Sequence, residues 1–254
     1  MNILVLIKKV ADPNLPQQFL SVSADGGAIE LHPASQYTIN QYDLNAVEAA
    51  VALKEASGGT VMIMTADDAG ADTFVRRALS MGADRAVRVE TDAAVRRDPL
   101  ALAEAIASAI RTIGVPDLIL AGRQASDTDA GLVPHAVAVK LGMPSLSPVV
   151  SLAMAGPGVA AVGKLAETTI DEYQVSLPAV LCVSNEINKP RMPSIKGVMA
   201  SKKVAIEVIS ASAEAAQADI RYAPKGSGRQ TQTVTYDSCS DDEKAAALLA
   251  ALGV

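Results

Sequence analysis

Residues 122–131 are the part of the chain best suited to bind a small polar ligand. Their sequence, Gly-Arg-Gln-Ala-Ser-Asp-Thr-Asp-Ala-Gly, places a glycine at each end of a set of polar side chains. Glycine lets a ligand approach the backbone closely, and free amides at the start of a following helix suit a phosphate. Gln124, Ser126 and Thr128 can bind the base or ribose of a nucleotide. The alternative is an ordinary loop between a strand and a helix, with an Asp in a turn or capping role.

Residue types that perform catalysis are scarce. The sequence contains neither of the common glycine-rich phosphate loops, G-x-G-x-x-G and G-x-x-x-x-G-K-[ST]. It has two histidines, and the second, His135, follows Pro134 in an expected first helical turn, where a surface or packing role is commoner. The acidic pairs at 67–68 and 127–129 can serve as acids or ligands, although turn and cap roles are commoner. A chain of this kind is expected to bind, carry or assemble.

Residues 188–203 combine apolar and cationic side chains in a segment poorly suited to a central strand. Pro190 and Pro193 lack the backbone donor that such a strand requires. The apolar residues are Met192, Ile195, Val198 and Met199, and the cationic residues are Lys189, Arg191, Lys196, Lys202 and Lys203. An apolar tip with a cationic fringe predicts a docking surface for an acidic partner. The alternative is a solvated loop with a few inward anchors.

Short apolar runs alternate with alanine-rich helical patterns in the first half of the chain, which is typical of βαβ units. Right-handed crossovers then predict a doubly wound, mainly parallel sheet with helices on both faces, a Rossmann-like α/β fold. Ligands bind such sheets beyond the carboxyl ends of the strands, here at residues 8–13, 66–70 and 122–131. The expected strands cover residues 2–8, 60–65, 86–89, 117–121 and 179–183, and the expected helices cover 43–56, 72–81, 99–113 and 131–141.

The pattern changes after about residue 145. Residues 149–152, 159–162 and 173–176 are expected to be short strands of a small β region spanning 145–178. Residues 184–239 show weak periodicity, which predicts an extended arm, and residues 241–252 are expected to form a short helix with Ser240 as its candidate cap. We therefore predict a nucleotide-binding α/β domain over residues 1–183. Residues 184–254 would hold the docking segment and an arm that packs on a partner subunit or, alternatively, on its own domain.

Composition limits the class of protein. The 254 residues are 50% hydrophobic but only 3% aromatic, so the core must consist of aliphatic side chains, which suits helices packed on a parallel sheet. A net charge of -6 argues against nucleic-acid binding. Cys182 and Cys239 lack C-x-x-C spacing, which indicates a reducing compartment and no metal site. No apolar run approaches the roughly 18 residues of a membrane helix or resembles a signal peptide, so we expect a cytoplasmic protein without a transmembrane segment.

Five short motifs, taken in order along the chain, resemble those of one known family, the beta (small) subunit of electron transfer flavoprotein. Each motif alone is moderately specific, and their common order makes the resemblance strong over essentially the whole chain. The motifs are an opening strand with a Lys-x-Val turn at 5–10, an acidic segment entering a helix at 40–50, an Ala-Leu-x-x-Gly-Ala-Asp-Arg-Ala stretch within 77–86, a Gly-x-Gln-x-x-Asp loop at 122–127, and Asn-x-Pro-Arg at 188–191 followed by Ile-Lys-Gly at 195–197.

The resemblance implies a subunit of a heterodimer that carries electrons and is not an enzyme by itself. An alpha subunit would supply most of the FAD site, and this chain would close one side of it. Electrons would arrive from a flavin-dependent dehydrogenase and leave to a quinone oxidoreductase or another acceptor. The resemblance also implies a structural AMP at the carboxyl edge of the sheet. Electron-bifurcating members of the family hold a second FAD there instead.

The resemblance also assigns residues by position. The nucleotide would be surrounded by Leu6, Asn40, Ala66, Gln124, Ala125, Ser126, Asp127, Thr128, Asp129, Ala130 and Gly131, whereas Tyr42 and the segment around Glu167 would lie near the flavin. The docking residues would be Arg191, Ile195, Lys196, Val198 and Met199, with Ile195 as the anchor for the dehydrogenase. Arg191 and the lysines would then be candidate steering charges.

Two stretches depart from the family pattern. The Gly-Pro that often follows the second strand is Asp67-Asp68 here, and a Gln-Thr-Gly or similar triplet is Leu132-Val133-Pro134. A phosphate would lose a hydroxyl or amide donor at this triplet, an effect of roughly 1–3 kcal/mol. AMP remains the expected ligand. The alternatives are a second FAD in a bifurcating flavoprotein, or a stand-alone adenine-nucleotide-binding protein, which the missing phosphate loop disfavours.

Overall fold

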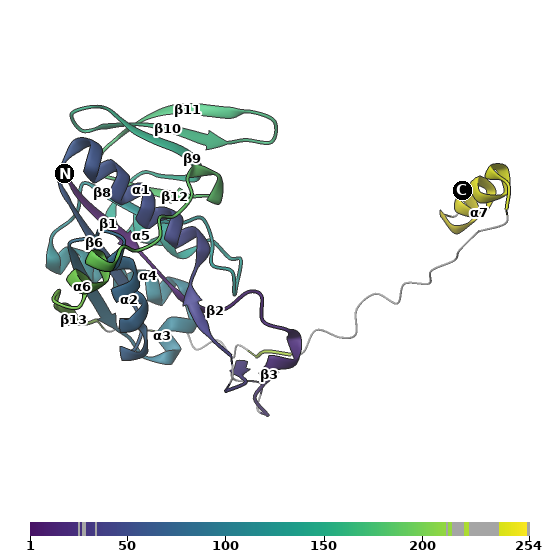
Figure 1. Ribbon diagram of the computed structural model, residues 1–254, viewed down its shortest axis with the longest axis horizontal. Helices are drawn as coiled ribbons and strands as arrows, with labels where there is room; N and C mark the ends of the chain where they lie inside the picture. Colours follow the sequence, from purple (N-terminus) through teal and green to yellow (C-terminus); the bar gives the residue numbers. More distant parts are fainter. Residues whose placement is uncertain are drawn as a thin grey trace.

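One mixed sheet of nine strands organises the part of the chain that the structure describes, namely residues 1–24, 26, 29–33, 35–211, 213–214, 221–223 and 239–252. In this computed structural model the strand order is β11-β10-β9-β12-β8-β1-β6-β7-β13 (Figure 1). The strands are β1 (Asn2–Leu6), β6 (Thr60–Ala66), β7 (Arg85–Glu90), β8 (Leu118–Gly122), β9 (Ser145–Gly156), β10 (Val159–Leu165), β11 (Ile170–Ser176), β12 (Ala179–Val183) and β13 (Ile206–Ser210).

The sheet is parallel from β9 through β12, β8, β1, β6 and β7 to β13, and only β9, β10 and β11 pair with one another antiparallel. The helices are α1 (Gln41–Ser57), α2 (Asp72–Ser80), α3 (Ala93–Arg97), α4 (Pro99–Ile113), α5 (Val133–Leu141), α6 (Ile195–Ser201) and α7 (Asp241–Leu252). The predicted doubly wound, mainly parallel α/β fold is thus confirmed, and β9, β10 and β11 form an antiparallel region at one edge of the sheet.

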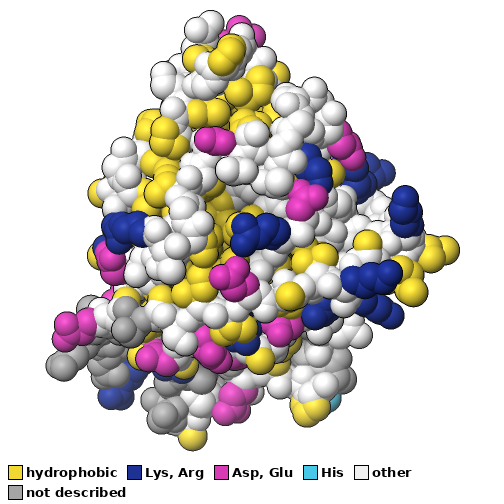
Figure 2. Space-filling model, turned by 90° about the vertical axis from the view of Figure 1, so that its left-hand side faces the viewer, with side chains coloured by type: hydrophobic (Ala, Val, Ile, Leu, Met, Phe, Trp, Pro, Cys, Tyr) yellow, Lys and Arg dark blue, Asp and Glu magenta, His cyan; other side chains and the backbone are white. Residues whose placement is uncertain are grey.

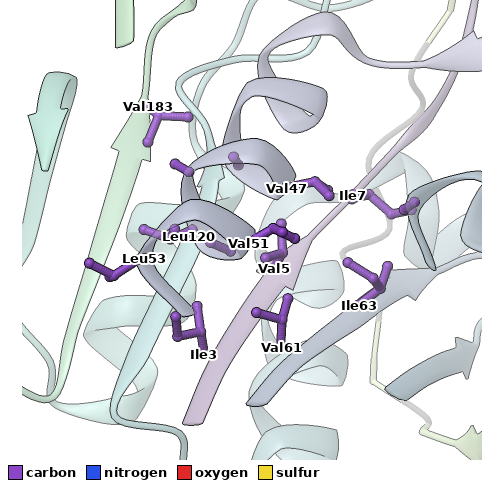
Figure 3. Close-up of a cluster of buried hydrophobic side chains, with 14 of the residues drawn as sticks. Ile3, Val5, Ile7, Val47, Val51, Leu53, Val61, Ile63, Leu120 and Val183 are labelled. Atoms are coloured by element: carbon purple, nitrogen blue, oxygen red, sulfur yellow. The ribbon is translucent and has the colours of Figure 1, made fainter. Parts of the chain in front are cut away.

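Alternate residues of the central strands pack under helices on opposite faces of the sheet. Ile3 and Val5 of β1 lie in one buried cluster with residues of α1 and α2, whereas Leu4 and Leu6 lie in a second cluster with residues of α4 and α5. Figure 3 shows Val47 and Val51 of α1 above the strands of the first cluster. Because both faces are covered, these strands are continuous apolar runs, as parallel strands usually are.

The sequence motif at 77–86 spans the end of α2 and the start of β7, in the βαβ unit formed by β6, α2 and β7. Gly82 has φ +124°, a conformation that favours glycine, and a side chain there would meet Val51 of α1. The carboxylate of Asp84 accepts the backbone N–H of Val61 at 2.8 Å and pairs with Lys54 at 2.5 Å. Through these bonds Asp84, in the loop between α2 and β7, holds the end of α1 and the start of β6 together. This motif therefore has a structural role.

Residues 184–210 differ from the extended arm that the sequence predicts. They contain α6, which packs on α2, and β13, which pairs with β7 from Ile206 opposite Ala86 to Ser210 opposite Glu90. The α/β domain therefore continues past residue 183. The partner of β13 lies about 120 residues earlier, so local periodicity carries no signal for it. The rest of the expected arm falls largely outside the described residues.

Two short antiparallel strand pairs were also not predicted from the sequence: β2 (Lys9–Ala11) with β5 (Tyr37–Ile39), and β3 (Leu20–Val22) with β4 (Ile29–Leu31). By contrast, α7 covers the expected residues, and its predicted cap is confirmed. Ser240 donates its backbone N–H to the Glu243 carboxylate at 2.7 Å, while the Glu243 N–H reaches the Ser240 hydroxyl at 3.4 Å. This reciprocal arrangement is a capping box.

Candidate functional site

A cavity of about 370 Å³ opens at the carboxyl edge of the sheet, where β1, β6 and β8 end. Apolar side chains form much of its wall, including Leu6 of β1, Ala66 of β6, Leu102 and Ile106 of α4, and Val133 of α5. The other lining residues are Ile7, Lys8, Asn40, Asp43, Arg96, Arg97, Pro99, Ala121, Gly122, Gln124, Ala125, Thr128, Ala130, Gly131, Leu132, Pro134 and Tyr222. An apolar wall with a few polar groups is the usual character of a small-molecule site.

Asp43 holds two strand ends together at the floor of this cavity. Its carboxylate accepts the backbone N–H of Lys8 at 2.8 Å and that of Gly122 at 2.9 Å. Burial raises the pKa of Asp43 from 3.8 to about 7, although the two backbone amides oppose the shift. A side chain at residue 122 would collide with Asp43 and Tyr42, so this glycine is needed for the close approach of helix and strand.

Asn40 shapes the loop that follows β8. Its side-chain amide donates to the carbonyl of Gln124 at 2.8 Å, and its Oδ1 accepts the N–H of Ser126 at 3.2 Å. The Gln124 amide in turn donates to Asp129 at 2.9 Å, and Asp129 adopts a positive φ of 50°, which is uncommon for a residue other than glycine. The loop is thereby held in one conformation above the cavity.

The residues assigned to the nucleotide from the sequence fall into two groups. The cavity brings together Leu6, Asn40, Ala66, Gln124, Ala125, Thr128, Ala130 and Gly131. Ser126, Asp127 and Asp129 lie outside its lining, as does Tyr42, which the resemblance assigned to the flavin. Ser126 and Asp129 instead make the loop contacts above, and Asp127 pairs with Lys8 at 2.7 Å. The ring of Tyr42 lies beside the guanidinium of Arg123, whose central carbon is 5.0 Å from the ring centroid.

The side of the cavity formed by α3 and α4 was not predicted from the sequence. The loop after β7 lies at the same edge of the sheet but is not one of the three loops at which a ligand was expected. The pair Arg96-Arg97, separated by Asp98 from a proline-started helix on that edge, was the available signal. No comparable signal marks Tyr222, which reaches the cavity from the C-terminal part of the chain and donates its N–H to the Gly26 carbonyl at 2.8 Å.

Basic side chains neutralise the two acids that depart from the family pattern. Asp67 pairs with Lys9 at 3.3 Å and with Arg96 at 3.6 Å, and Asp68 pairs with the same two cations at 3.4 and 3.5 Å. Burial opposes ionisation of Asp68, but the Gly70 N–H and the Lys9 charge hold its pKa below the usual value. These carboxylates are therefore compensated within the protein.

Arg97 differs from the other cations that line the cavity, Lys8 and Arg96, which pair with acidic side chains. It lines the cavity, is exposed, and has no ion pair within the described ranges. Nearby, α5 begins at the cavity without a side-chain cap on its first amides. A guanidinium and a free helix start together suit an anionic group.

The docking segment of residues 188–203 presents its apolar residues to solvent. Met192 and Ile195 are 86% and 87% exposed, and Val198 and Met199 of α6 are also exposed. At the height at which Figure 1 draws α6, Figure 2 shows hydrophobic side chains projecting at the right-hand edge beside several Lys and Arg side chains. The residues assigned to docking are thus exposed to solvent, with one exception.

Arg191 is that exception, because its charge is already used inside the protein. Its guanidinium pairs with Glu48 at 2.8 Å and with Glu55 at 2.6 Å, both on α1. The expectation that Arg191 is a free steering charge is therefore corrected. Lys189, Lys196, Lys202 and Lys203 show no ion pair in the part of the chain that the structure describes, so they remain available for that role.

Other reactive residues do not form a second site in the described part of the chain. No three His, Cys, Asp or Glu residues gather there as metal ligands. Burial raises the pKa of the Cys182 thiol to about 12, which makes it unreactive. His135 contacts the Ser145 hydroxyl at 3.0 Å on the surface. None of the described helices is both long and apolar enough to cross a bilayer.

Comparison with known proteins points to one family. The sequence model described as "Electron transfer flavoprotein domain" matches residues 31–214. The chain is 34% identical over 219 residues to an electron transfer flavoprotein subunit beta of Mycobacterium leprae, covering 82% of this chain and 79% of that protein. A subunit beta of Syntrophomonas wolfei is 36% identical over 224 residues, with coverage of 87% and 83%. The caffeyl-CoA reductase-Etf complex subunit CarD of Acetobacterium woodii is 32% identical over 200 residues, with coverage of 78% and 74%.

Proposed function

The chain belongs to the electron transfer flavoprotein family, among its beta subunits, and from this premise we propose that it forms a heterodimer with an alpha subunit. The heterodimer holds FAD at the subunit interface, and FAD supplies the redox chemistry. It accepts electrons from a flavin-dependent dehydrogenase and passes them to a quinone oxidoreductase or another acceptor. The similarity to beta subunits over most of their length supports this role. The protein itself positions the FAD and supplies the electrostatic environment around it.

The single observation that best supports a nucleotide role is the cavity at the carboxyl edge, and we assign AMP to it. Its volume of about 370 Å³ lies near the lower end of the range of small-molecule pockets, about 300–1,000 Å³, which favours a mononucleotide. The apolar wall suits the purine, and Asn40, Gln124 and Thr128 suit the ribose and base edges. Arg97 and the uncapped start of α5 suit the phosphate.

The flavin would meet this chain on a different surface. Tyr42 and the turn around Glu167 are the residues that we assign to it. Tyr42 lies at the first turn of α1, directly before Asp43, so its backbone is held by the same bonds that shape the cavity floor. The aromatic ring and the Arg123 guanidinium beside it offer a flat, cationic surface to a flavin.

Two further surfaces are assigned to protein partners. The exposed apolar residues of the docking segment, with Ile195 as anchor, receive the dehydrogenase, because exposed apolar groups with a polar rim are typical of interfaces. Helix α7 packs on the alpha subunit. Its Leu248 and Leu249 are 62% and 50% exposed, which leaves apolar surface for a partner to cover.

The decisive experiment is to co-express the chain with its alpha subunit, purify the complex, and identify the nucleotides released by denaturation. We expect a yellow heterodimer that yields one FAD and one AMP. A colourless, stable monomer from the same co-expression would contradict the proposal and favour a stand-alone nucleotide-binding protein.

A second candidate is a bifurcating flavoprotein subunit with a second FAD in the cavity. The triplet Leu132-Val133-Pro134 has no side-chain donor for a phosphate, which weakens the case for AMP but applies equally to the pyrophosphate of FAD. The observation that favours this candidate is the similarity to a subunit of a reductase-Etf complex, which fits a larger assembly. Two FAD per heterodimer in the same extraction would establish this candidate and exclude the first.

A further inference from the structure

Helix α1 connects the cavity to the docking segment. At its start, Asn40 and Asp43 bond to the loop and strand that border the cavity. Further along, Asn45 and Asn188 exchange hydrogen bonds, with the Asn45 amide donating to the Asn188 carbonyl at 2.8 Å and the Asn188 amide donating to the Asn45 carbonyl at 3.0 Å. One rigid element therefore touches both sites, and its 1.5 Å rise per residue separates Asn40 from Glu55 by about 22 Å.

Arg191 makes the strongest contact between the docking segment and α1. Its Nε and one terminal nitrogen donate to the two oxygens of Glu48 at 2.8 and 2.9 Å, and its backbone N–H donates to the same carboxylate at 3.0 Å. Its two terminal nitrogens also donate to the two oxygens of Glu55 at 2.6 and 2.9 Å. The bond to Arg191 holds the pKa of Glu55 below its usual value. Planar forked pairing of this kind requires arginine.

Helix α6 is held independently at its middle and its end. Gly197 lies so close to the Ser80 carbonyl of α2 that a side chain there would collide with it. At the end of α6, the Arg76 guanidinium from α2 donates to the carbonyls of Ser201 and Val204 at 2.9 and 3.2 Å. Ile195, at the first position of α6, thus stands between the Arg191 contacts and the Gly197 contact while its side chain stays 87% exposed.

We propose that Arg191, together with Glu48 and Glu55, is a positioning residue for recognition of the dehydrogenase: it fixes Ile195 in a preformed place and does not itself contact the partner. This inference rests on the proposed docking role of the segment. A preformed surface binds more tightly because less conformational freedom is lost on association. The link through α1 also fixes the docked partner relative to the cavity.

A double-mutant cycle tests the inference in the purified heterodimer. The probe is a flavin dehydrogenase of the source organism that reduces the wild-type heterodimer with saturation behaviour. We expect Ile195→Ala to raise the KM for the dehydrogenase by about tenfold or more, and Arg191→Ala to raise it by about tenfold with little change in kcat. In the Ile195→Ala background, Arg191→Ala should add less than about twofold, because both changes remove the same contact.

Four comparisons separate positioning from a general structural effect. Arg191→Lys should restore part of the loss, because lysine can pair with one carboxylate, and Glu55→Gln should give a smaller loss without leaving a charge unpaired. Amide hydrogen exchange should rise at residues 192–203 and stay unchanged at the cavity, with flavin and nucleotide content preserved. The matched control is Arg111→Ala, which removes an arginine pair with Glu104 on α4 and should leave the KM unchanged.

The possible failures are distinguishable. An Ile195→Ala variant with unchanged KM would overturn the docking role itself. Suppose that Ile195→Ala raises the KM as expected, and that adding Arg191→Ala to it raises the KM by the same factor as Arg191→Ala does alone. Arg191 then contacts the partner directly, and the inference is wrong. An unchanged KM in Arg191→Ala, or exchange that rises throughout the domain, would also overturn it.

Discussion

Asp43 accepts the backbone N–H of Gly122 at 2.9 Å, so a carboxylate from the first turn of α1 closes the end of the central strand β8. The same carboxylate accepts the N–H of Lys8 after β1. Because β1 and β8 are neighbours in the sheet, one buried side chain sets the geometry of the edge at which the cavity opens.

This arrangement predicts a pH dependence of stability that Asp43→Asn should remove. Burial raises the pKa of Asp43 from 3.8 to about 7, so the folded state holds this proton more tightly than the unfolded state. The contribution of Asp43 to stability is therefore full below about pH 4 and is lost as the pH rises through about 7. The stability gap between wild type and Asp43→Asn should narrow over this range by up to about 4 kcal/mol.

The measurement is thermal unfolding of the two heterodimers at several pH values between about 4 and 8. At the low end of this pH range the asparagine variant should be less stable than the wild type. Its NH2 group replaces one of the two accepting oxygens, so its amide can accept only one of the two N–H groups. A gap that stays constant across the range would show that Asp43 does not titrate in it.

Gly122→Ala should destabilise the domain and weaken nucleotide retention. The added methyl group would meet Asp43 and the backbone-proximal atoms of Tyr42, neither of which can move without opening the cavity floor. Overpacking of this kind costs about 1–3 kcal/mol, which lowers Tm by several degrees in a chain of this size. Gly156→Ala is the matched control, because a side chain there meets nothing within 4 Å. Equal Tm values for the two variants would contradict the predicted clash.

Arg97→Ala should lower the affinity for AMP by about 10- to 100-fold, because a hydrogen bond to a charged group contributes about 1.5–3 kcal/mol. Equilibrium dialysis of heterodimer stripped of nucleotide and reloaded with AMP measures this loss. Arg85→Ala, which removes an exposed arginine paired with Glu207, should bind AMP as the wild type does. An unchanged affinity in Arg97→Ala would remove this residue from the phosphate site.

Reversal of two charges, Lys202→Glu with Lys203→Glu, should slow association with an acidic dehydrogenase surface. The two lysines adjoin α6 and are exposed, so they act on the encounter rate more than on the packed contact. The second-order rate constant should fall most at low ionic strength and approach the wild-type value at about 1 M salt, where charges are screened within about 3 Å. Stopped-flow reduction over a range of salt concentrations tests this, and a deficit independent of salt would argue against steering.

Several elements could be predicted from the sequence because their signals are local. Helix α4 occupies the expected residues 99–113, between a first-turn proline and a following glycine, and α7 occupies the expected 241–252. Strand β12 also matches, as a short apolar run at 179–183. In each case neighbouring residues carry the periodicity, the cap or the break that defines the element.

Contacts between distant residues could not be predicted in this way. Strand β13 has little alternation of its own and forms because β7 offers it an edge. The pair Arg96-Arg97 is visible in the sequence, but only the fold shows that α3 borders the cavity and that Arg96 pairs with Asp67 and Asp68. The sequence showed a cationic fringe on the docking segment but could not show which of its cations is already paired.

The sequence by itself determined the family and the alternation of strands and helices, and it marked residues 122–131 and 188–203 as candidate binding regions, because these depend on residue type and local order. Only the tertiary structure decided what Arg191 does. Its partners Glu48 and Glu55 lie 143 and 136 residues away along the chain, and the pairing exists because α1 and the docking segment pack side by side. The physical reason is that charge is a property of the residue, whereas its availability depends on what the fold places within reach of it.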